Sequence, residues 1–314
     1  MTEKNVCCIG ELLIDMYCTD VDVALKDGAN FKKMAGGAPA NVAATIARLG
    51  GSSSFAGKVG KDSFGDFLIE TLEQYDVNTN MISRDEALPT TIAFVSLTAD
   101  GERDFQFNRG ADKNLTMADL SEDQILQSNV IHFGSATALL EGETRNTYLK
   151  WMDKASETGI YISFDPNFRQ DLWNKNEEEF VRLSKEAISR ANFVKVSHEE
   201  LELITNKKDV SEGVAELHRL GADLVTVTMG KEGSFLSNGK EQEIVPSIEV
   251  KAIDATGAGD AFIGAVLYKF ANSEIDMGDF SQLKEVVRFA NKVGAVVCTK
   301  IGSLTALPTM EEVK

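Results

Sequence analysis

The sequence predicts an α/β fold in which a mostly parallel central sheet is covered by helices on both faces. Short apolar runs alternate along the chain with longer stretches of helical periodicity. The runs are apolar throughout, which is typical of strands buried on both faces. No repeat or low-complexity linker interrupts this alternation, so we expect a single domain spanning residues 1–314.

The expected strands begin with a long apolar one at Val6–Ile14. Shorter apolar runs follow at Ser53–Gly57, Val130–Phe133, Tyr161–Phe164, Phe193–Val196 and Leu224–Val227. Helical stretches are expected near Asp62–Tyr75, Gly142–Glu157, Glu177–Arg190 and Gly213–Leu220. Strands and helices in alternation favour crossover connections and hence parallel strand pairing.

One segment breaks the alternation. Thr91–Leu97 and Arg103–Asn108 are strand-like, and the Ala-Asp-Gly-Glu sequence at residues 99–102 is a hairpin turn signal. The first of these strands is apolar on the face that begins with Ile92 and also on the face that begins with Ala93. This pattern suits a small sheet lying between a ligand and a partner chain. An ordinary edge hairpin of the main sheet is the alternative.

Composition limits the class of protein. The chain has 49 acidic and 32 basic residues and a formal net charge of −17. It has no basic stripe for a nucleic acid. The acidic surplus reflects either solubility or adaptation to a salty cytoplasm. With no apolar run of eighteen residues and no signal-peptide pattern, we expect a cytoplasmic protein without a membrane partner. Its four cysteines lack metal-binding spacing and are expected to be reduced thiols.

The most informative motif is Asp254-Ala-Thr-Gly-Ala-Gly-Asp260, which runs directly into the apolar stretch Ala261–Ala271. A glycine-bearing turn at a helix start presents backbone N–H groups to an anion. A carboxylate at Asp260 would repel that anion unless it accepts a proton from an attacking hydroxyl group. The alternative is a glycine turn with an acidic residue that stabilises the helix dipole.

The general nucleotide-binding motifs fit this segment poorly. It lacks the lysine and hydroxyl residue of a P-loop. A dinucleotide fingerprint would need a third glycine at the position of Phe262, and it would follow the first strand of the fold.

A second glycine motif, Gly36-Gly37-Ala-Pro-Ala-Asn41, precedes a helix expected at Ala40–Leu49. The glycine pair lets a ligand approach the backbone, and the Asn41 amide both donates and accepts hydrogen bonds. A polyol requires such groups. Equally, Asn41 could satisfy local backbone at a loop–helix junction.

Together the two motifs resemble those of the ribokinase-like family of carbohydrate kinases, and the resemblance covers nearly the whole chain. Gly10–Asp15, Gly57–Gly65 and Asp165–Arg169 are similar to bacterial fructokinases. The resemblance implies ATP-dependent phosphorylation of a fructose hydroxyl, with the 6-OH as the expected acceptor. A 2-keto-3-deoxygluconate kinase or ribokinase is the alternative within the family. A catalytically silent sugar or nucleotide sensor is the alternative from another class.

The resemblance also implies roles for individual residues. Asp260 would be the catalytic base, and the backbone of Gly257, Ala258 and Gly259 would form an anion hole for the transferring phosphate. The positions that match sugar-binding residues of the family are Asp15, Gly36, Gly37 and Asn41. Arg109 and Arg169 match arginines that reach the substrate in the acid-sugar kinases, although either could instead be a surface or salt-bridged residue.

The remaining implied residues concern the nucleotide and ions. Thr228, Gly230 and Gly233 match a nucleotide-binding turn, and Asn291 matches a helix beside the adenine. Glu200 would act on Mg²⁺ through water. Ser197 stands where the family has Asn, and Ser197 with Glu200 also forms a capping-box sequence. Asp254 and Thr256, with carbonyls near Gly302, match a monovalent-cation site for K⁺.

The family also has a β lid formed by insertions, here expected near residues 16–35 and 90–110. Its members often dimerise through this lid, so the resemblance implies a homodimer.

Overall fold

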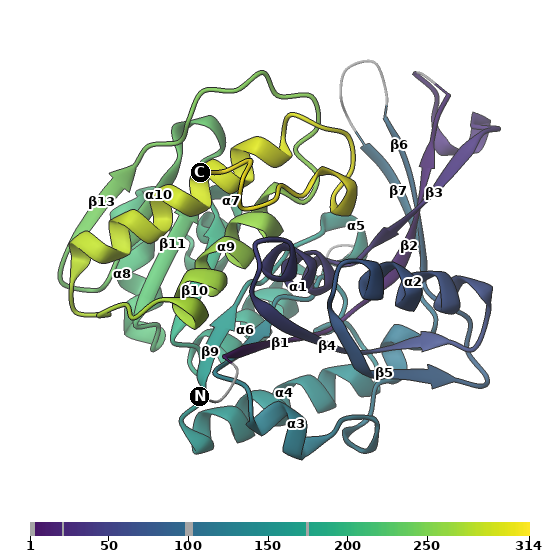
Figure 1. The fold of residues 1–314 in the computed structure, drawn as a ribbon, viewed down its shortest axis with the longest axis horizontal. Helices are drawn as coiled ribbons and strands as arrows, with labels where there is room; N and C mark the ends of the chain where they lie inside the picture. Colours follow the sequence, from purple (N-terminus) through teal and green to yellow (C-terminus); the bar gives the residue numbers. More distant parts are fainter. Residues whose placement is uncertain (1–3, 21, 98–102, 174–175) are drawn as a thin grey trace.

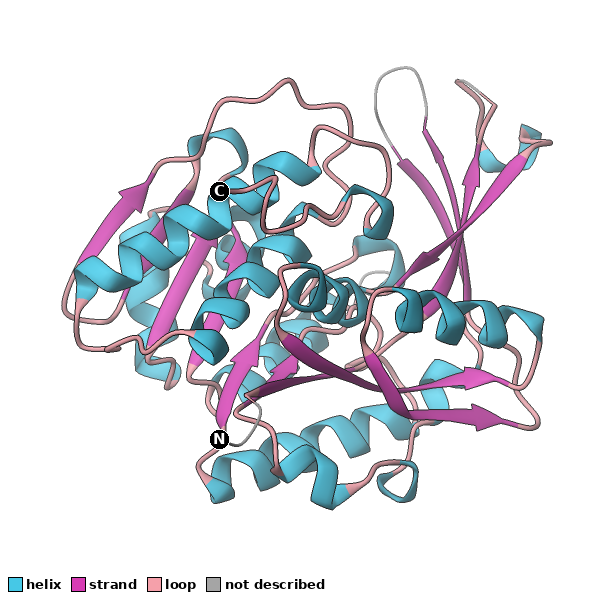
Figure 2. Cartoon of the chain, viewed as in Figure 1, coloured by secondary structure: helices cyan, strands magenta, loops and turns pink. Residues whose placement is uncertain are grey.

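The computed structural model describes residues 4–20, 22–97, 103–173 and 176–314, so the turn predicted at 99–102 lies outside the described residues. The main sheet contains, in spatial order, β13 (Gln242–Val245), β12 (Ser234–Ser237), β11 (Leu224–Thr228), β10 (Phe193–Ser197), β9 (Tyr161–Phe164), β8 (Val130–Phe133), β1 (Asn5–Ile9), β4 (Ser52–Gly60) and β5 (Asn78–Asp85). Neighbouring strands from β11 to β5 are parallel, whereas β12 and β13 pair antiparallel. The predicted mostly parallel sheet is confirmed (Figures 1 and 2).

Helices cover both faces of this sheet, as predicted. One face packs against α1 (Ala38–Arg48), α2 (Ser63–Gln74), α9 (Ala258–Asn272) and α10 (Phe280–Val297). The other face packs against α3 (Glu122–Leu126), α4 (Glu143–Thr158), α5 (Gln170–Trp173), α6 (Glu177–Ile188), α7 (His198–Thr205) and α8 (Val210–Leu220). Strand β1 shows why both layers form, because Val6 and Cys8 join the first core and Cys7 and Ile9 join the second.

Short 3₁₀ helices lie in the connections: η1 (Leu25–Asp27), η2 (Ala111–Asn114), η3 (Met117–Asp119), η4 (Gly230–Glu232) and η5 (Leu304–Ala306). Within the described parts of the chain, none of the helices is long and apolar enough to cross a membrane.

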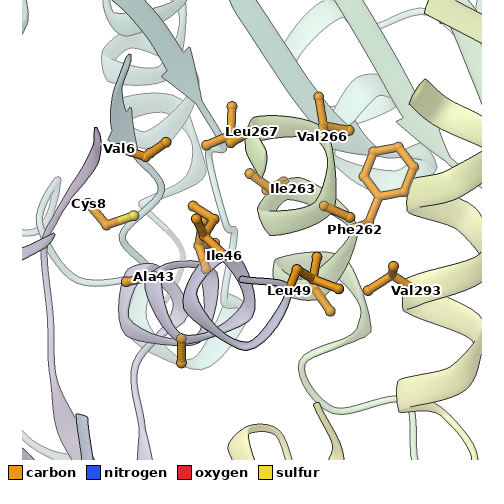
Figure 3. Close-up of a cluster of buried hydrophobic side chains, with 14 of the residues drawn as sticks. Val6, Cys8, Ala43, Ile46, Leu49, Phe262, Ile263, Val266, Leu267 and Val293 are labelled. Atoms are coloured by element: carbon orange, nitrogen blue, oxygen red, sulfur yellow. The ribbon is translucent and has the colours of Figure 1, made fainter. Parts of the chain in front are cut away.

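Helices α1 and α9 pack unusually closely. A β-carbon on Gly264 of α9 would lie 2.5 Å from Cβ of Thr45 in α1, so glycine is needed at this crossing. Around it, Ala43 and Ile46 of α1 and Ile263 of α9 fill the space beside β1 (Figure 3). This contact fixes the N-terminal turns of the two helices relative to one another.

A second, four-stranded sheet projects from one end of the molecule (Figure 1). Its strands are β3 (Phe31–Gly36), β2 (Leu13–Cys18), β6 (Ile92–Leu97) and β7 (Arg103–Asn108), in that spatial order. The predicted hairpin therefore belongs to this sheet, which we call the lid, and not to an edge of the main sheet. The segments predicted to build a lid, near 16–35 and 90–110, both contribute to it.

The prediction of one strand at Val6–Ile14 is wrong. The segment is divided between β1 of the main sheet and β2 of the lid, with Gly10 directly after β1. Gly10 has φ of +152°, and a β-carbon there would lie 2.7 Å from Cβ of Ser135. Because both strands are apolar, hydrophobic periodicity alone did not reveal the break between them.

The two apolar faces of β6 have different surroundings. Ala93 and Val95 are buried on the inner face, where their partners in β2 are Asp15 and Tyr17. On the outer face Phe94 is half-buried, and its ring meets the edge of Phe31 at a centroid distance of 5.8 Å. The predicted alternation of faces is therefore present, and the inner face is the one that carries Asp15.

Candidate active site

The two glycine motifs meet at the carboxyl ends of the parallel strands, the edge where open α/β sheets usually bind ligands. Asn41 lies in the first turn of α1 and Asp260 in the first turn of α9. The Asn41 Nδ2 atom donates a hydrogen bond of 2.8 Å to Oδ2 of Asp260. Both side chains are buried, at 6% and 8% exposure. The close crossing of α1 and α9 thus joins two motifs that are 219 residues apart.

The turn before α9 is held by the Asp254 carboxylate. The backbone N–H and the hydroxyl group of Thr256 donate to Oδ1 of Asp254 at 3.0 and 2.6 Å, and the Gly302 N–H donates to Oδ2 at 2.9 Å. Gly257 then adopts a left-handed conformation with φ of +77°. The N–H groups of Gly259 and Asp260 belong to the first helical turn, which leaves them without intrahelical acceptors. This turn can bind an anion through its backbone.

Asp260 lies beside this anion-binding turn. The pKa of Asp260 is raised to about 6, mainly by burial and also by the nearby Asp165 carboxylate. The hydrogen bond from Asn41 and the charges of Arg169 and Lys195 oppose this rise. A carboxylate with a pKa near 6 is ionised at neutral pH and can accept a proton from a nearby hydroxyl group.

The inner face of the lid brings Asp15 to the same region. A β-carbon on Gly36 would lie 2.0 Å from Oδ2 of Asp15, so glycine is needed beside this carboxylate. Gly37 has φ of +116°, and a β-carbon there would lie 2.4 Å from the Glu11 carbonyl oxygen. Burial raises the pKa of Asp15 to about 7; the guanidinium of Arg169 lowers it, and the carboxylate of Asp260 raises it. These charged groups are therefore close enough to interact.

The amide of Asn41 has capacity left for a ligand. Its nitrogen is engaged with Asp260, whereas Oδ1 is buried and has no hydrogen-bond partner among the residues that the structure describes. A buried acceptor of this kind is costly unless a donor reaches it. Together with the Asp15 carboxylate, it could accept hydrogen bonds from hydroxyl groups of a ligand.

Glu11, to which sequence reasoning assigned no role, fixes the start of α1. Its Oε1 atom accepts the Ala38 N–H at 2.9 Å, and its Oε2 atom accepts the Ser135 hydroxyl. Burial raises the pKa of Glu11 to about 7. The side chain connects the first turn of α1 to the segment that follows β8. Its occurrence inside the apolar segment Gly10–Asp15 was the signal that could have revealed it.

Lys195 and Asp165 form a buried ion pair that sequence reasoning also missed. Lys195 Nζ lies 3.0 Å from Oδ2 of Asp165, and their side chains are 9% and 1% exposed. Burial opposes the charge on Lys195, but the carboxylates of Asp165 and Glu200 outweigh it and raise the pKa of Lys195. A β-carbon on Gly259 would lie 3.2 Å from Nζ, which places this cation beside the anion-binding turn. A lysine inside the apolar run 193–196 was the available signal.

Glu200 is occupied by backbone hydrogen bonds. Its two carboxylate oxygens accept the N–H groups of Phe168 and Ser197, each at 2.7 Å. The Ser197 hydroxyl in turn accepts the Glu200 N–H at 3.1 Å, which completes a capping box. Burial and the charge of Asp165 raise the pKa of Glu200, whereas Lys195 opposes that rise.

The residues that match nucleotide-binding positions line one cavity of about 780 Å³. Thr228, Gly230, Gly233 and Asn291 share this cavity with Ala258 and Gly259 of the anion-binding turn. Asn291 supports its wall, because Nδ2 donates to the Val245 carbonyl at 2.8 Å and Oδ1 accepts the Ser234 hydroxyl at 2.6 Å.

The two arginines have different positions. Arg109 donates from Nε and Nη2 to Oδ2 of Asp112 at 3.1 and 3.0 Å, and from Nη1 to the Glu141 carbonyl at 3.1 Å. These contacts favour the salt-bridged alternative for Arg109. Arg169 is exposed, donates to the Phe168 carbonyl at 2.9 Å, and interacts electrostatically with Asp15.

A helix start that can bind an anion, a cavity that reaches it and polar groups under the lid are compatible with phosphoryl transfer to a hydroxyl group. A family model described as "pfkB family carbohydrate kinase" matches residues 3–310. The chain belongs to this family and is a carbohydrate kinase.

Similar proteins agree with this assignment. Fructokinase-2 of Solanum habrochaites is 40% identical over 306 residues, which cover 96% of this chain and 93% of that protein. A fructokinase from Xylella fastidiosa, solved with bound ATP, is 32% identical with a TM-score of 0.89. The match covers 99% of this chain and 97% of the fructokinase chain. A fructokinase from Vibrio cholerae O395, solved with fructose, ADP and calcium ion, is 31% identical with a TM-score of 0.87. The match covers 100% of this chain and 98% of that fructokinase chain.

Replacing Lys195 with methionine should destabilise the protein strongly, because Asp165 would remain buried without its cation. We expect the free energy of unfolding to fall by about 3–5 kcal/mol, measured by urea denaturation. Lys61→Met is the matched control, since Lys61 pairs with Glu86 at an exposed site. It should leave the unfolding midpoint nearly unchanged. Equal midpoints for the two variants would show that the buried pair does not contribute as described.

Proposed function

We propose that the protein is an ATP-dependent fructokinase that transfers the γ-phosphate of ATP to the 6-hydroxyl of fructose. The observation that carries this proposal is the buried Asp260, which lies between the anion-binding turn and the polar groups under the lid. Curated relatives that match over nearly the whole chain are named as fructokinases, which supports fructose as the sugar.

Each part of the reaction has residues suited to it. The Asp260 carboxylate takes the hydroxyl proton as the sugar oxygen forms its bond to the γ-phosphorus, and the bond to the departing ADP oxygen breaks. Of the predicted anion hole at residues 257–259, the Gly259 N–H would stabilise the charge on the phosphoryl oxygens together with the Asp260 N–H, because the Ala258 N–H already donates to the Ala255 carbonyl. The ammonium of Lys195, 3.2 Å from the position of a β-carbon on Gly259, would add a cation on the same side.

The charges around the sugar region favour a neutral substrate over an acid sugar. Asp15 interacts electrostatically with Glu11 and Asp260, so this region has several carboxylates. The guanidinium of Arg109 already contacts Asp112 and the Glu141 carbonyl. A 2-keto-3-deoxygluconate carboxylate would therefore meet repulsion, which the charge of Arg169 would offset in part. The intact Asp260 and the intact turn favour a catalyst over a silent sensor.

The residues present are compatible with the ions that such a kinase uses. Mg²⁺ would neutralise the phosphates of ATP, and Glu200, whose oxygens accept backbone N–H groups, would contribute through water. The carboxylate of Asp254 and nearby carbonyl groups are oxygen donors of the kind that K⁺ accepts. Asp254 holds Thr256 and Gly302 together, so K⁺ bound there would stabilise the anion-binding turn.

We also propose that the chain works as a single cytoplasmic kinase domain whose lid joins two copies into a homodimer. On the outer face of the lid, Met16 and Ile92 pack against the first hydrophobic core, whereas Phe94 is half-buried and lies outside that core. We expect Phe94 to contact the partner chain. Its cysteines are free thiols, as suits a reducing compartment.

A charge in the outer face of the lid should weaken the dimer. We expect Phe94→Asp to shift the mass measured by light scattering from that of two chains toward that of one at micromolar concentration. Ile244→Asp is the control, because Ile244 is also apolar and is exposed on β13 of the main sheet, away from the lid. A monomeric unmodified protein, or an unchanged mass for Phe94→Asp, would contradict the lid interface.

The choice of sugar is tested by measuring ADP release with fructose, ribose and 2-keto-3-deoxygluconate as acceptors. We expect the highest kcat/KM for fructose, because its binding requires no carboxylate to enter a region rich in carboxylates. A higher kcat/KM for 2-keto-3-deoxygluconate would overturn the assignment to fructose. ADP release that no sugar stimulates would favour the silent sensor.

Replacing Asp260 with asparagine should remove the base while keeping the shape of the site. We expect turnover to fall by about 10²–10⁴. In the unmodified enzyme, kcat/KM should rise with pH through about 6, because Asp260 accepts a proton only when ionised. The variant should lose this acidic limb of the pH profile.

Binding measurements separate loss of the base from loss of the fold. Fructose and ATP should bind Asp260→Asn within several-fold of their normal affinities, and its melting curve should match that of the unmodified protein. Turnover within tenfold of normal in such a folded variant would refute Asp260 as the base.

A further inference from the structure

A hollow of about 510 Å³ lies at the edge of the main sheet opposite the candidate active site. Asn5, Ser52 and Asn78 are the first residues of β1, β4 and β5, which are neighbours in the sheet, and Asn129 directly precedes β8. Because these strands are parallel, their amino ends point away from the edge that carries the two glycine motifs. The described lining residues of this hollow take no part in the candidate active site.

We call this cavity the amide hollow, after the side chains that line it. Its described lining residues are Asn5, Ser52, Ser54, Asn78, Asn80, Met81, Gln124, Gln127 and Asn129. Six of these nine carry amides and none of the nine is charged, although 26% of the residues in the chain are charged. A phosphate or carboxylate ligand would call for arginine or lysine, and a metal ion would call for carboxylates. The lining therefore favours a neutral ligand.

The floor of the amide hollow is fixed by hydrogen bonds between strands. Asn5 Nδ2 donates to Oγ of Ser54 at 3.0 Å, and the Ser52 hydroxyl donates to Oδ1 of Asn5 at 3.3 Å. Ser54 and the apolar Met81 are buried, at 2% and 4% exposure. The floor thus has its shape before a ligand arrives, so little of it must become ordered on binding.

The rim of the amide hollow is made of exposed amides. Asn80 lies on β5, Gln124 and Gln127 lie on α3 and at its end, and Asn129 precedes β8; all four are exposed. Each amide has two N–H donors and a carbonyl acceptor, which together match hydroxyl groups that both donate and accept. An apolar ligand would cover these amides without replacing their hydrogen bonds to water.

We propose that the amide hollow is a binding site for a neutral saccharide of one or two sugar units. The sugar hydroxyl groups would exchange hydrogen bonds with the rim amides, and sugar C–H groups would lie toward Met81. The volume of about 510 Å³ falls within the range of about 300–1,000 Å³ that is usual for small-molecule sites. The proposal uses no group of the candidate active site, so it stands apart from the proposed fructokinase function.

The test is a saturation-transfer NMR titration with maltose, a neutral disaccharide. We expect saturable binding with a Kd on the order of 1 mM, because the rim is exposed and the contacts are uncharged. Maltobionate carries a carboxylate in place of the reducing end of maltose. It should bind at least about fivefold more weakly, because no cation lines the described part of the hollow and the chain has a net charge of −17.

Gln124→Ala combined with Gln127→Ala removes two rim amides at α3, where alanine is compatible with the helix. This double variant should raise the Kd for maltose at least about fivefold. Asn80→Ala, on a different element, should change the Kd in the same direction.

The matched control combines Gln74→Ala with Gln106→Ala, which removes two exposed glutamines that do not line the hollow. Its Kd should stay within about twofold of normal, and the melting curves of all variants should match that of the unmodified protein. Absence of saturable maltose binding by the unmodified protein would overturn the proposal. Equal Kd values for the two double variants, or equal affinity for maltose and maltobionate, would overturn it as well.

Discussion

The close packing of α1 against α9 is the contact on which the candidate site depends. Gly264 allows α9 to approach Thr45 of α1 to a distance that no larger residue would permit. At this separation the first turns of the two helices open onto one space, and Asn41 reaches Asp260. Since α1 begins at the lid and α9 begins at the nucleotide cavity, one helix–helix contact positions both halves of the site.

The chemistry of the site follows from buried charge. Asp15, Asp260 and Glu200 are carboxylates that burial makes easier to protonate. Lys195 keeps its proton in the same surroundings because Asp165 pairs with it. Opposite charges held this close, with little water between them, interact much more strongly than on the surface. In the proposed reaction, Lys195 would therefore offset the negative charge of the phosphate, and Asp260 would remain able to accept the hydroxyl proton.

The inner face of the lid reaches both halves of the site. Asp15 lies close enough to Asp260 to interact with its charge, and Tyr17 on the same face of β2 contacts Thr256 just before α9. Small movements of a strand in this sheet would reach both places, because neighbouring strands are joined by backbone hydrogen bonds.

The sequence by itself determined the parallel α/β sheet, most of its helices, the hairpin near residues 91–108 and the two glycine motifs, because local periodicity and turn chemistry encode these features. The lid as a whole was expected from the family resemblance. It did not reveal that Val6–Ile14 crosses between two sheets, since the strands on either side of Gly10 are equally apolar. Only the tertiary structure showed that Asn41 donates a hydrogen bond to Asp260, that Lys195 lies beside Gly259, and that Arg109 forms an ion pair with Asp112. Burial, pKa and ion pairing depend on neighbours distant in sequence, so spacing along one chain does not contain them.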